Sequence, residues 1–127
     1  MRKVFDYKEL NLPEKQQGFL RLFLAGLSSL DIIDRVVLFG SCAKGNIHKN
    51  SDIDLFVVTK REPTMNEEIY IMAECPPDYQ SDYYIEADII IKPIDVYEKH
   101  KDQIGMIQKY VEQEGADLTG LLSECAG

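Results

Sequence analysis

The chain has 127 residues, of which 45% are hydrophobic and 28% are charged, and its formal net charge is −8 with a pI near 4.7. These proportions are typical of a globular protein, and the length suits a single domain over residues 1–127. The acidic excess argues against a nucleic-acid-binding protein, because contact with phosphates requires a basic surface. It is compatible with solubility alone or with a basic protein partner.

Three cysteines, Cys42, Cys75 and Cys125, are widely separated in the sequence. An odd number at such spacings fits neither a disulfide framework nor a zinc site, and it suits a reducing compartment. The first residues lack the apolar segment of a signal peptide, and no apolar run reaches the roughly 18–20 residues of a membrane span. We therefore expect a cytoplasmic protein without a membrane segment.

The first third of the chain predicts a loose arm, a helix and a strand. Residues 1–12 are polar and mixed, which favours the arm. Apolar residues then recur at helical spacing and predict a helix over 13–30 with one buried face. Continuous apolar residues over 36–39 predict a strand over 35–39 that is covered on both sides. The apolar face of the helix consists of Phe19, Leu20, Phe23, Leu24, Leu27 and Leu30.

The middle of the chain predicts a second strand and a second helix. A helical turn over 41–45 and a polar loop lead into a strand over 52–59. Thr64 and Glu67 have the spacing of a capping box, which predicts a helix over 65–75. We expect its apolar side chains to point into the core, and these are Met65, Ile69 and Met72.

The last third predicts a third strand over 83–91, because β-branched residues concentrate there. Helical spacing predicts a further helix over 94–113, interrupted near Gly105. Residues 117–122 fit either a short edge strand or a loop, and 123–127 fit a frayed tail. The inward face of this last helix is expected to carry Ile104, Ile107 and Val111. Together the elements predict an α/β domain, a small mixed sheet with helices packed mainly on one face.

The stretch from Val36 to Val58 carries the strongest functional signal. Side chains in a strand alternate between its faces, so Asp52 and Asp54 point the same way, roughly 6–7 Å apart at the backbone. Two carboxylates on one face of an apolar strand are costly unless a cation neutralises them, which favours a divalent metal site. The turn at Gly40 and Ser41 offers backbone N–H groups to a phosphate.

Two competing motifs fail. A P-loop requires Lys-Ser/Thr where this chain has Asn46 and Ile47. A calcium loop requires a ligand and a turn glycine where it has Phe56 and Val57.

The spacing of Gly40-Ser41, ten residues and then Asp52-x-Asp54 resembles the signature of the polymerase-β-type nucleotidyltransferase superfamily. Ala43 and Gly45 complete the pattern G-S-x-A-x-G. The short chain is similar to the minimal nucleotidyltransferases of that superfamily, and the resemblance extends from about Val36 to Ile91. It implies a nucleotidyltransferase fold.

The resemblance also implies roles for these residues. Asp52 and Asp54 would bind two Mg²⁺ ions, and Gly40 and Ser41 would bind the β- and γ-phosphates of ATP. Lys44 stands where relatives often carry arginine, so it either contacts phosphate or is simply a solvated lysine.

A third carboxylate is expected on a neighbouring strand. Asp88 is the preferred candidate because it directly precedes the apolar run Ile89–Ile91, and Glu86, on the same strand face, is the alternative. By resemblance, the third acid helps to bind the catalytic metal and draws the proton from the acceptor hydroxyl. Cys42 is interpreted as a packing residue, and His48 and His100 as surface residues.

The resemblance therefore predicts an Mg²⁺-dependent enzyme that transfers a nucleoside monophosphate, AMP from ATP, to a hydroxyl. The minimal relatives are often encoded beside a helical HEPN protein, which suggests an antitoxin that adenylylates a HEPN toxin. A chain of this size leaves the acceptor or a second wall of the site to a partner or to another copy of itself. Transfer to a small molecule is a lesser option, and a non-catalytic module that neutralises a partner by contact is the alternative.

Overall fold

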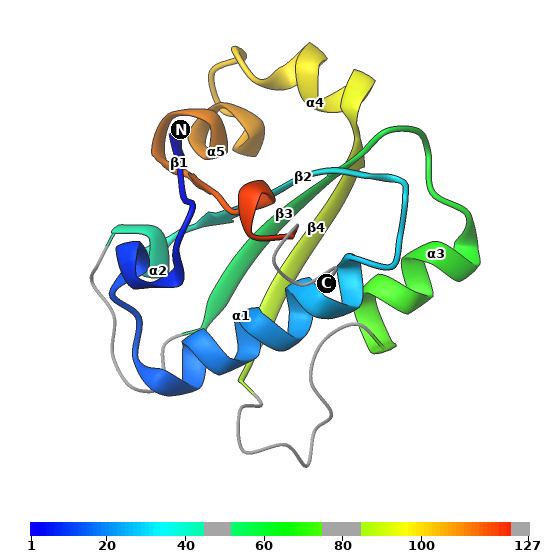
Figure 1. Cartoon of the computed structure of the whole chain (residues 1–127). Helices are drawn as coiled ribbons and strands as arrows, with labels where there is room; N and C mark the ends of the chain where they lie inside the picture. The colour runs from blue at the N-terminus through cyan, green and yellow to red at the C-terminus, as the bar shows by residue number, and fades with distance from the viewer. Residues whose placement is uncertain (45–51, 75–84, 123–127) are drawn as a thin grey trace.

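A five-stranded mixed sheet forms the centre of the computed structural model, which describes residues 1–44, 52–74 and 85–122. The strands are β1 (Arg2–Lys3), β2 (Ile33–Phe39), β3 (Ile53–Thr59), β4 (Ala87–Pro93) and β5 (Ala116–Asp117). They lie in the order β1-β5-β2-β3-β4 (Figure 1). β2 is antiparallel to both β3 and β5, whereas β1 pairs with β5, and β3 with β4, in parallel.

Helices connect the strands and lie on both faces of the sheet. They are η1 (Tyr7–Leu10), α1 (Glu14–Leu27), α2 (Ser41–Lys44), α3 (Met65–Ile69), η2 (Tyr70–Glu74), α4 (Ile94–His100), α5 (Ile107–Glu114) and η3 (Thr119–Leu121). The predicted capping box is confirmed, since Thr64 and Glu67 bond each other's backbone N–H groups at the start of α3. The interruption near Gly105 is confirmed as well, with Gly105 at φ 87° between α4 and α5. No helix in the described ranges is long and apolar enough to cross a membrane.

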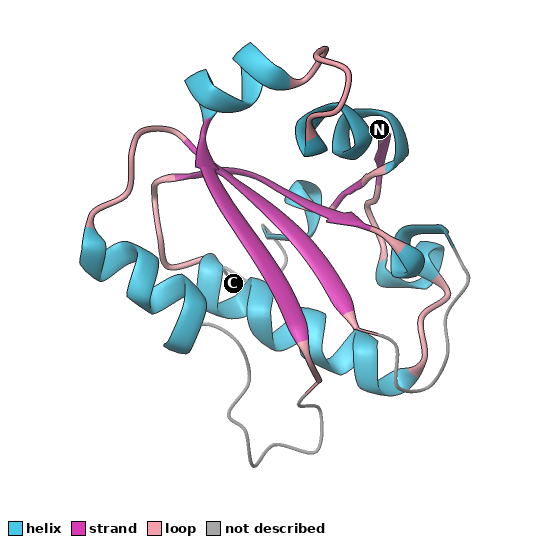
Figure 2. Ribbon diagram, turned by 180° about the vertical axis from the view of Figure 1, so that it is seen from behind, coloured by secondary structure: helices cyan, strands magenta, loops and turns pink. Residues whose placement is uncertain are grey.

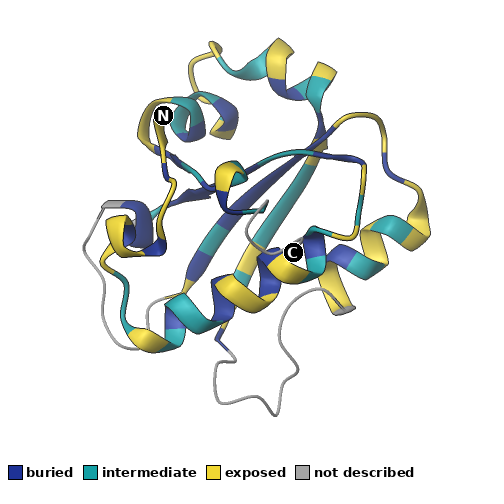
Figure 3. Cartoon of the chain, in the orientation of Figure 1, coloured by how far each residue is buried: buried dark blue, intermediate teal, exposed yellow. Residues whose placement is uncertain are grey.

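Side-chain alternation along β3 divides the core into two layers. Ile53, Leu55 and Val57 belong to the larger layer, which also contains the predicted apolar face of α1. Phe56 and Val58 belong to a smaller layer, with Tyr97 of α4 and Val111 of α5. Figure 3 shows that β3 is mostly buried and that α1 alternates between buried and exposed residues. The α/β class with a mixed sheet is therefore confirmed. The larger core lies on one face, as predicted, and α4 and α5 cover part of the other face.

The second face of the sheet is only partly covered. Figure 2 looks onto it: α4 and α5 lie toward one end, and no described helix crosses the beginnings of β3 and β4. This open area is where the functional residues described below are found.

The prediction of a loose arm over residues 1–12 is wrong. β1 joins the sheet beside β5, and η1 follows with a capping box between Asp6 and Glu9. Val4, Tyr7 and Leu10 are at most 4% exposed. Their apolar side chains recur every third residue, and their burial outweighs the polar residues between them.

Two predicted inward faces are also wrong. Met65, Ile69 and Met72 are at least 50% exposed, because this segment packs on α1 through its neighbours. Ile71 is fully buried, and the Tyr70 hydroxyl donates to the carbonyl of Gly26 at 3.0 Å.

Of the three residues predicted to face inward in the last helical region, Ile104 and Ile107 are exposed and Val111 is buried. Ile104 lies in the connection between the helices, so helical periodicity does not apply to it.

The ends of the predicted elements differ in smaller ways. The third strand begins at Ala87, and the part of the prediction over 83–84 lies outside the described residues. Residues 117–122 end β5 and form η3, and β5 is an interior strand because β1 lies outside it. The predicted tail over 123–127 also lies outside the described residues.

The buried N-terminal segment gives a stability prediction. Leu10→Ala is expected to lower the free energy of unfolding by about 2–5 kcal/mol, the usual cost of removing a buried leucine side chain. Phe5→Ala, at a position 64% exposed in the same segment, is the matched control and should cost less than about 1 kcal/mol. Urea unfolding measures both values. Equal small losses of unfolding free energy in the two variants would support the prediction of a loose arm.

Candidate active site

Asp54 and Asp88 lie side by side on the open face of the sheet. They are register partners in the parallel pair β3–β4, so their backbones are about 4.8 Å apart and their side chains share a face. The predicted choice of Asp88 over Glu86 agrees with this geometry. Glu86 is exposed and precedes β4, and its carbonyl accepts a hydrogen bond from the N–H of Ile53 at 3.0 Å.

The two carboxylates repel each other. The pKa of Asp54 is raised first by partial burial, next by the charges of Asp88 and Asp52, and also by a hydrogen bond with Asp88. None of the ion pairs within the described residues involves these three carboxylates. Their negative charge is therefore not balanced by side chains of the described part of the chain.

Gly40 closes the site on the β2 side. It ends β2 at φ 75°, a left-handed conformation that favours glycine. A Cβ atom at this position would lie 3.2 Å from Cγ of Asp54 and closer still to Oδ2. Asp54 is thus confined between the backbone of Gly40 and the side chain of Asp88, and only glycine leaves room for it.

Cys42 connects the turn to the first acid. It is buried in α2, and its thiol donates to the carbonyl oxygen of Asp52 at 3.3 Å. Burial, followed by the charges of Asp54 and Asp52, raises the pKa of the Cys42 thiol to about 11. The thiol therefore stays protonated near neutral pH, which supports its interpretation as a packing residue rather than a nucleophile.

Asp52 lies just before β3 and is exposed. Its charge contributes to the raised pKa of Asp54, after burial and the charge of Asp88. Within residues 1–44, 52–74 and 85–122, however, no three acidic, histidine or cysteine side chains are gathered closely enough to enclose a metal ion.

The donor set nevertheless fits a hard divalent cation. Mg²⁺ prefers a few carboxylate oxygens and keeps several waters, so it does not need a closed protein cage. Asp54 and Asp88 supply two adjacent carboxylates whose mutual repulsion a cation would relieve, and the charge of the exposed Asp52 also acts on Asp54. These three residues are the ones that could hold it.

Several predicted positions cannot be placed. The side chains of Ser41 and Lys44 lie outside the described part of the structure, as do Gly45 and His48. The backbone of Ser41 begins α2 directly after Gly40, so the predicted turn is present. His100 ends α4, where its ring bonds Gln103, and it is not part of the acidic cluster.

Two contacts at the site were not predicted. The ring of Tyr110 on α5 packs edge-on against Phe39, whose register partner is Asp54, with ring centroids 6.3 Å apart. Arg2 of β1 donates to the carbonyl oxygen of Ala43 in α2 at 3.2 Å. Neither Tyr110 nor Arg2 belongs to a motif, so the sequence offers no signal for these contacts.

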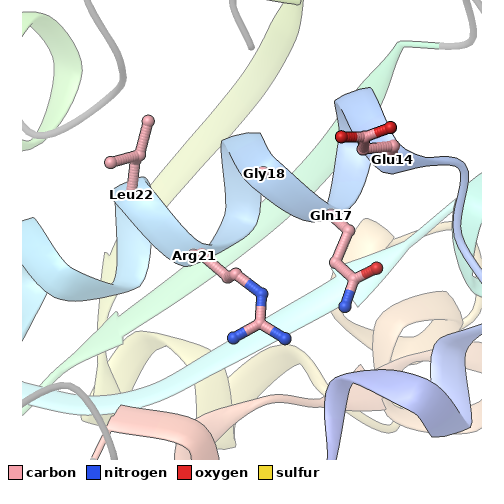
Figure 4. Close-up of a pocket in the computed structure, with 5 residues that line it drawn as sticks. All are labelled: Glu14, Gln17, Gly18, Arg21 and Leu22. Carbon is pink, nitrogen blue, oxygen red and sulfur yellow. The ribbon is translucent and has the colours of Figure 1, made fainter.

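A hollow of about 370 Å³ lies elsewhere, on the outer side of α1 (Figure 4). Glu14, Gln17, Gly18, Arg21 and Leu22 line it. Because α1 covers the face of the sheet opposite Asp54, this hollow is not part of the acidic site.

The confinement of Asp54 gives a prediction for Gly40. Gly40→Ala and Gly105→Ala both force a Cβ into a left-handed conformation, at about 1–2 kcal/mol each. Only at Gly40 does the Cβ also meet Asp54, which should add about 1–3 kcal/mol. Gly105 has open space around it and is the matched control. Equal losses in urea unfolding would show that Asp54 moves aside freely.

The raised pKa of Asp54 gives a pH prediction. The folded protein holds a proton on Asp54 more tightly than the unfolded chain, so ionised Asp54 destabilises the fold near about pH 7. Asp54→Asn should therefore raise the melting temperature there. The gain should vanish as the pH falls below about 4, where both states are protonated.

Glu86→Gln is the control for this experiment, because Glu86 lies outside the β3–β4 pairing. Thermal unfolding of both variants over a pH series measures the effect. A pH-independent gain for Asp54→Asn would mean that carboxylate repulsion is not its cause.

The chain was compared with known proteins. Residues 20–116, which include Gly40, Asp52, Asp54 and Asp88, match the family model described as "Nucleotidyltransferase domain". A protein of Methanocaldococcus jannaschii named "Putative protein adenylyltransferase" is 39% identical over 69 residues. This match covers 54% of the chain and 64% of that relative, so the chain spans less than two thirds of its length.

A crystal structure of a "putative nucleotidyltransferase" from Sulfolobus solfataricus is similar at 25% identity and a TM-score of 0.48, over 70% of this chain and 79% of that one. The family match covers most of the chain, including the strands and the turn that form the acidic site. The chain therefore belongs to the nucleotidyltransferase domain family.

Proposed function

We propose that this chain transfers AMP from ATP to a hydroxyl group of a protein, in a reaction that depends on Mg²⁺. The observation that carries the proposal is the contact between Asp54 and Asp88 beside the Gly40 turn, on the open face of the sheet. Nucleotidyl transfer needs such a place, where a cation neutralises the triphosphate and an acceptor oxygen can approach the α-phosphorus.

The residues would divide the work by position. The backbone of Gly40 and the turn that begins at Ser41 would receive the β- and γ-phosphates. Asp52, Asp54 and Asp88 would hold two Mg²⁺ ions, which neutralise the triphosphate and make the acceptor hydroxyl more acidic when they are bound. Asp88 is exposed at the outer strand, so it is the carboxylate best placed to take the proton from an incoming hydroxyl.

A protein acceptor is favoured by two observations. The similar archaeal protein is named as a protein adenylyltransferase. On the face that carries the acids, no described helix crosses the beginnings of β3 and β4 (Figure 2), an arrangement that would suit a large acceptor. A helical HEPN-type toxin would suit this role, with the chain as its antitoxin, and the net charge of −8 would favour a basic partner surface.

Transfer of label from α-labelled ATP to a purified HEPN-type protein tests the proposal. Wild type with Mg²⁺ should label the acceptor, and omission of Mg²⁺ should abolish labelling. Asp54→Asn and Asp88→Asn should each lower the rate by about 100-fold or more, since each removes charge from the site of transfer. Glu86→Gln is the matched control and should stay within about threefold of wild type.

A second measurement separates loss of chemistry from loss of the fold. Mg²⁺ should raise the melting temperature of wild type and of Glu86→Gln, but not that of Asp54→Asn. If no label is transferred and Asp54→Asn still neutralises the partner, the chain is a non-catalytic binding module. Equal loss in Glu86→Gln and Asp88→Asn would show that the third carboxylate has been assigned wrongly.

A further inference from the structure

The turn that follows Gly40 is tied to the N-terminal strand. Arg2 of β1 donates from Nη2 to the carbonyl oxygen of Ala43 in α2 at 3.2 Å, across 41 positions of sequence. β1 is separated from β2 by β5, because Arg2 pairs with Ala116 and Ala116 pairs with Leu38. The contact therefore connects an outer strand of the sheet directly to the turn at the end of β2.

Arg2 contacts α2 from the α1 side of the sheet. Leu38 and Ala43 belong to the larger core, on the α1 side of the sheet, and the register places Arg2 on that side too. Asp54 faces the opposite side, with Phe56 and Val58. A side chain on the far face of the sheet does not meet the acids, so any effect of Arg2 on the site must act through α2.

The turn needs external support. α2 has only four residues, and its backbone is closed by a bond from the N–H of Ala43 to the carbonyl of Gly40 at 3.2 Å. The thiol of Cys42 donates to Asp52 at 3.3 Å, which is a weak hydrogen bond. The guanidinium of Arg2 carries a charge, and charge-assisted hydrogen bonds are the stronger kind.

We propose that Arg2 is a positioning residue for the nucleotide-binding turn. By holding the carbonyl of Ala43, it fixes α2 so that Gly40 and Ser41 present their backbone to the triphosphate in one arrangement. This inference rests on the proposed function of the turn. Arg2 lies outside residues 20–116, the segment that matches the nucleotidyltransferase family. The N-terminal strand would thus support the turn from outside the segment that matches the family.

Two variants, Arg2→Ala and Arg2→Lys, test the inference, and Lys3→Ala is the matched control. Lys3 neighbours Arg2 on β1, is exposed, and loses the same charge on substitution. In Arg2→Ala, amide hydrogen exchange over residues 40–44 should become about tenfold faster without nucleotide, while the rest of β2 keeps its protection. In Lys3→Ala it should not change. Arg2→Lys should restore part of the protection, because its ammonium group can still donate to a carbonyl.

The kinetic readout separates positioning from chemistry. Arg2→Ala should raise the KM for ATP with Mg²⁺ about tenfold and change kcat by less than about threefold, because the acids remain in place. Arg2→Lys should recover part of this loss. Arg2→Ala that matches Lys3→Ala in exchange and in KM would overturn the inference, and so would faster exchange across the whole sheet.

Failure of the proposed function would be visible separately. If wild type neither binds ATP nor transfers label, the function fails. Exchange over residues 40–44 then still decides whether Arg2 holds the turn: selective acceleration in Arg2→Ala supports the inference, and its absence overturns it.

Discussion

The repulsion between Asp54 and Asp88 is imposed by the sheet and cannot be relaxed locally. The two residues are register partners between β3 and β4, and a slip of one strand by one residue would move each of its side chains to the other face of the sheet. The apolar residues that follow each acid hold the strands in this register. The energy of burying those residues therefore keeps two like charges in contact, and this contact is the basis for proposing a cation at this end of the sheet.

The surroundings of Asp54 follow from the same constraint. Gly40 is required on one side because the carboxylate lies against its backbone, and Asp88 occupies the other side. Cys42 stays a protonated thiol beside these charges, so it can donate to the carbonyl of Asp52. Phe39, the register partner of Asp54, packs on Tyr110, and Phe56 packs on Tyr97 farther along the same face. Of the described helices, none crosses the beginnings of β3 and β4, where Asp54 and Asp88 lie (Figure 2).

The predictable parts of the fold are the helices and strands that are long enough to show a repeating pattern of apolar residues. Asp54 was predicted from its spacing after Gly40 and Ser41, and Asp88 from the family resemblance and its place before the apolar run Ile89–Ile91. Both lie on strands of seven residues, long enough to show a strand pattern in the sequence. β1 and β5 have two residues each, too few for any period, so their pairing was invisible. Segments of one chain that meet only in the folded sheet, such as Arg2 and Ala43, leave no local signal either.

The error on α3 has a different physical cause. Helical spacing identifies an apolar stripe but not the side to which it turns. Met65 and Ile69 form such a stripe, yet the segment is fixed by its neighbours, with Ile71 buried and Tyr70 bonded to Gly26 on α1. A tyrosine that can bury its ring and still satisfy its hydroxyl competes effectively with methionine for the inward position.

Electrostatics links the proposed metal and nucleotide steps. The site combines acidic residues with a chain of net charge −8, and a triphosphate is itself strongly negative. Without a cation, the carboxylates of Asp52, Asp54 and Asp88 would repel the phosphates that the Gly40 turn is suited to receive. Mg²⁺ and ATP are therefore expected to bind as one unit, with the ion between the acids and the phosphates. The position of the Gly40 turn would then be important for ATP binding, because the carboxylates would already fix the Mg²⁺–ATP complex and the turn would have to fit its phosphates.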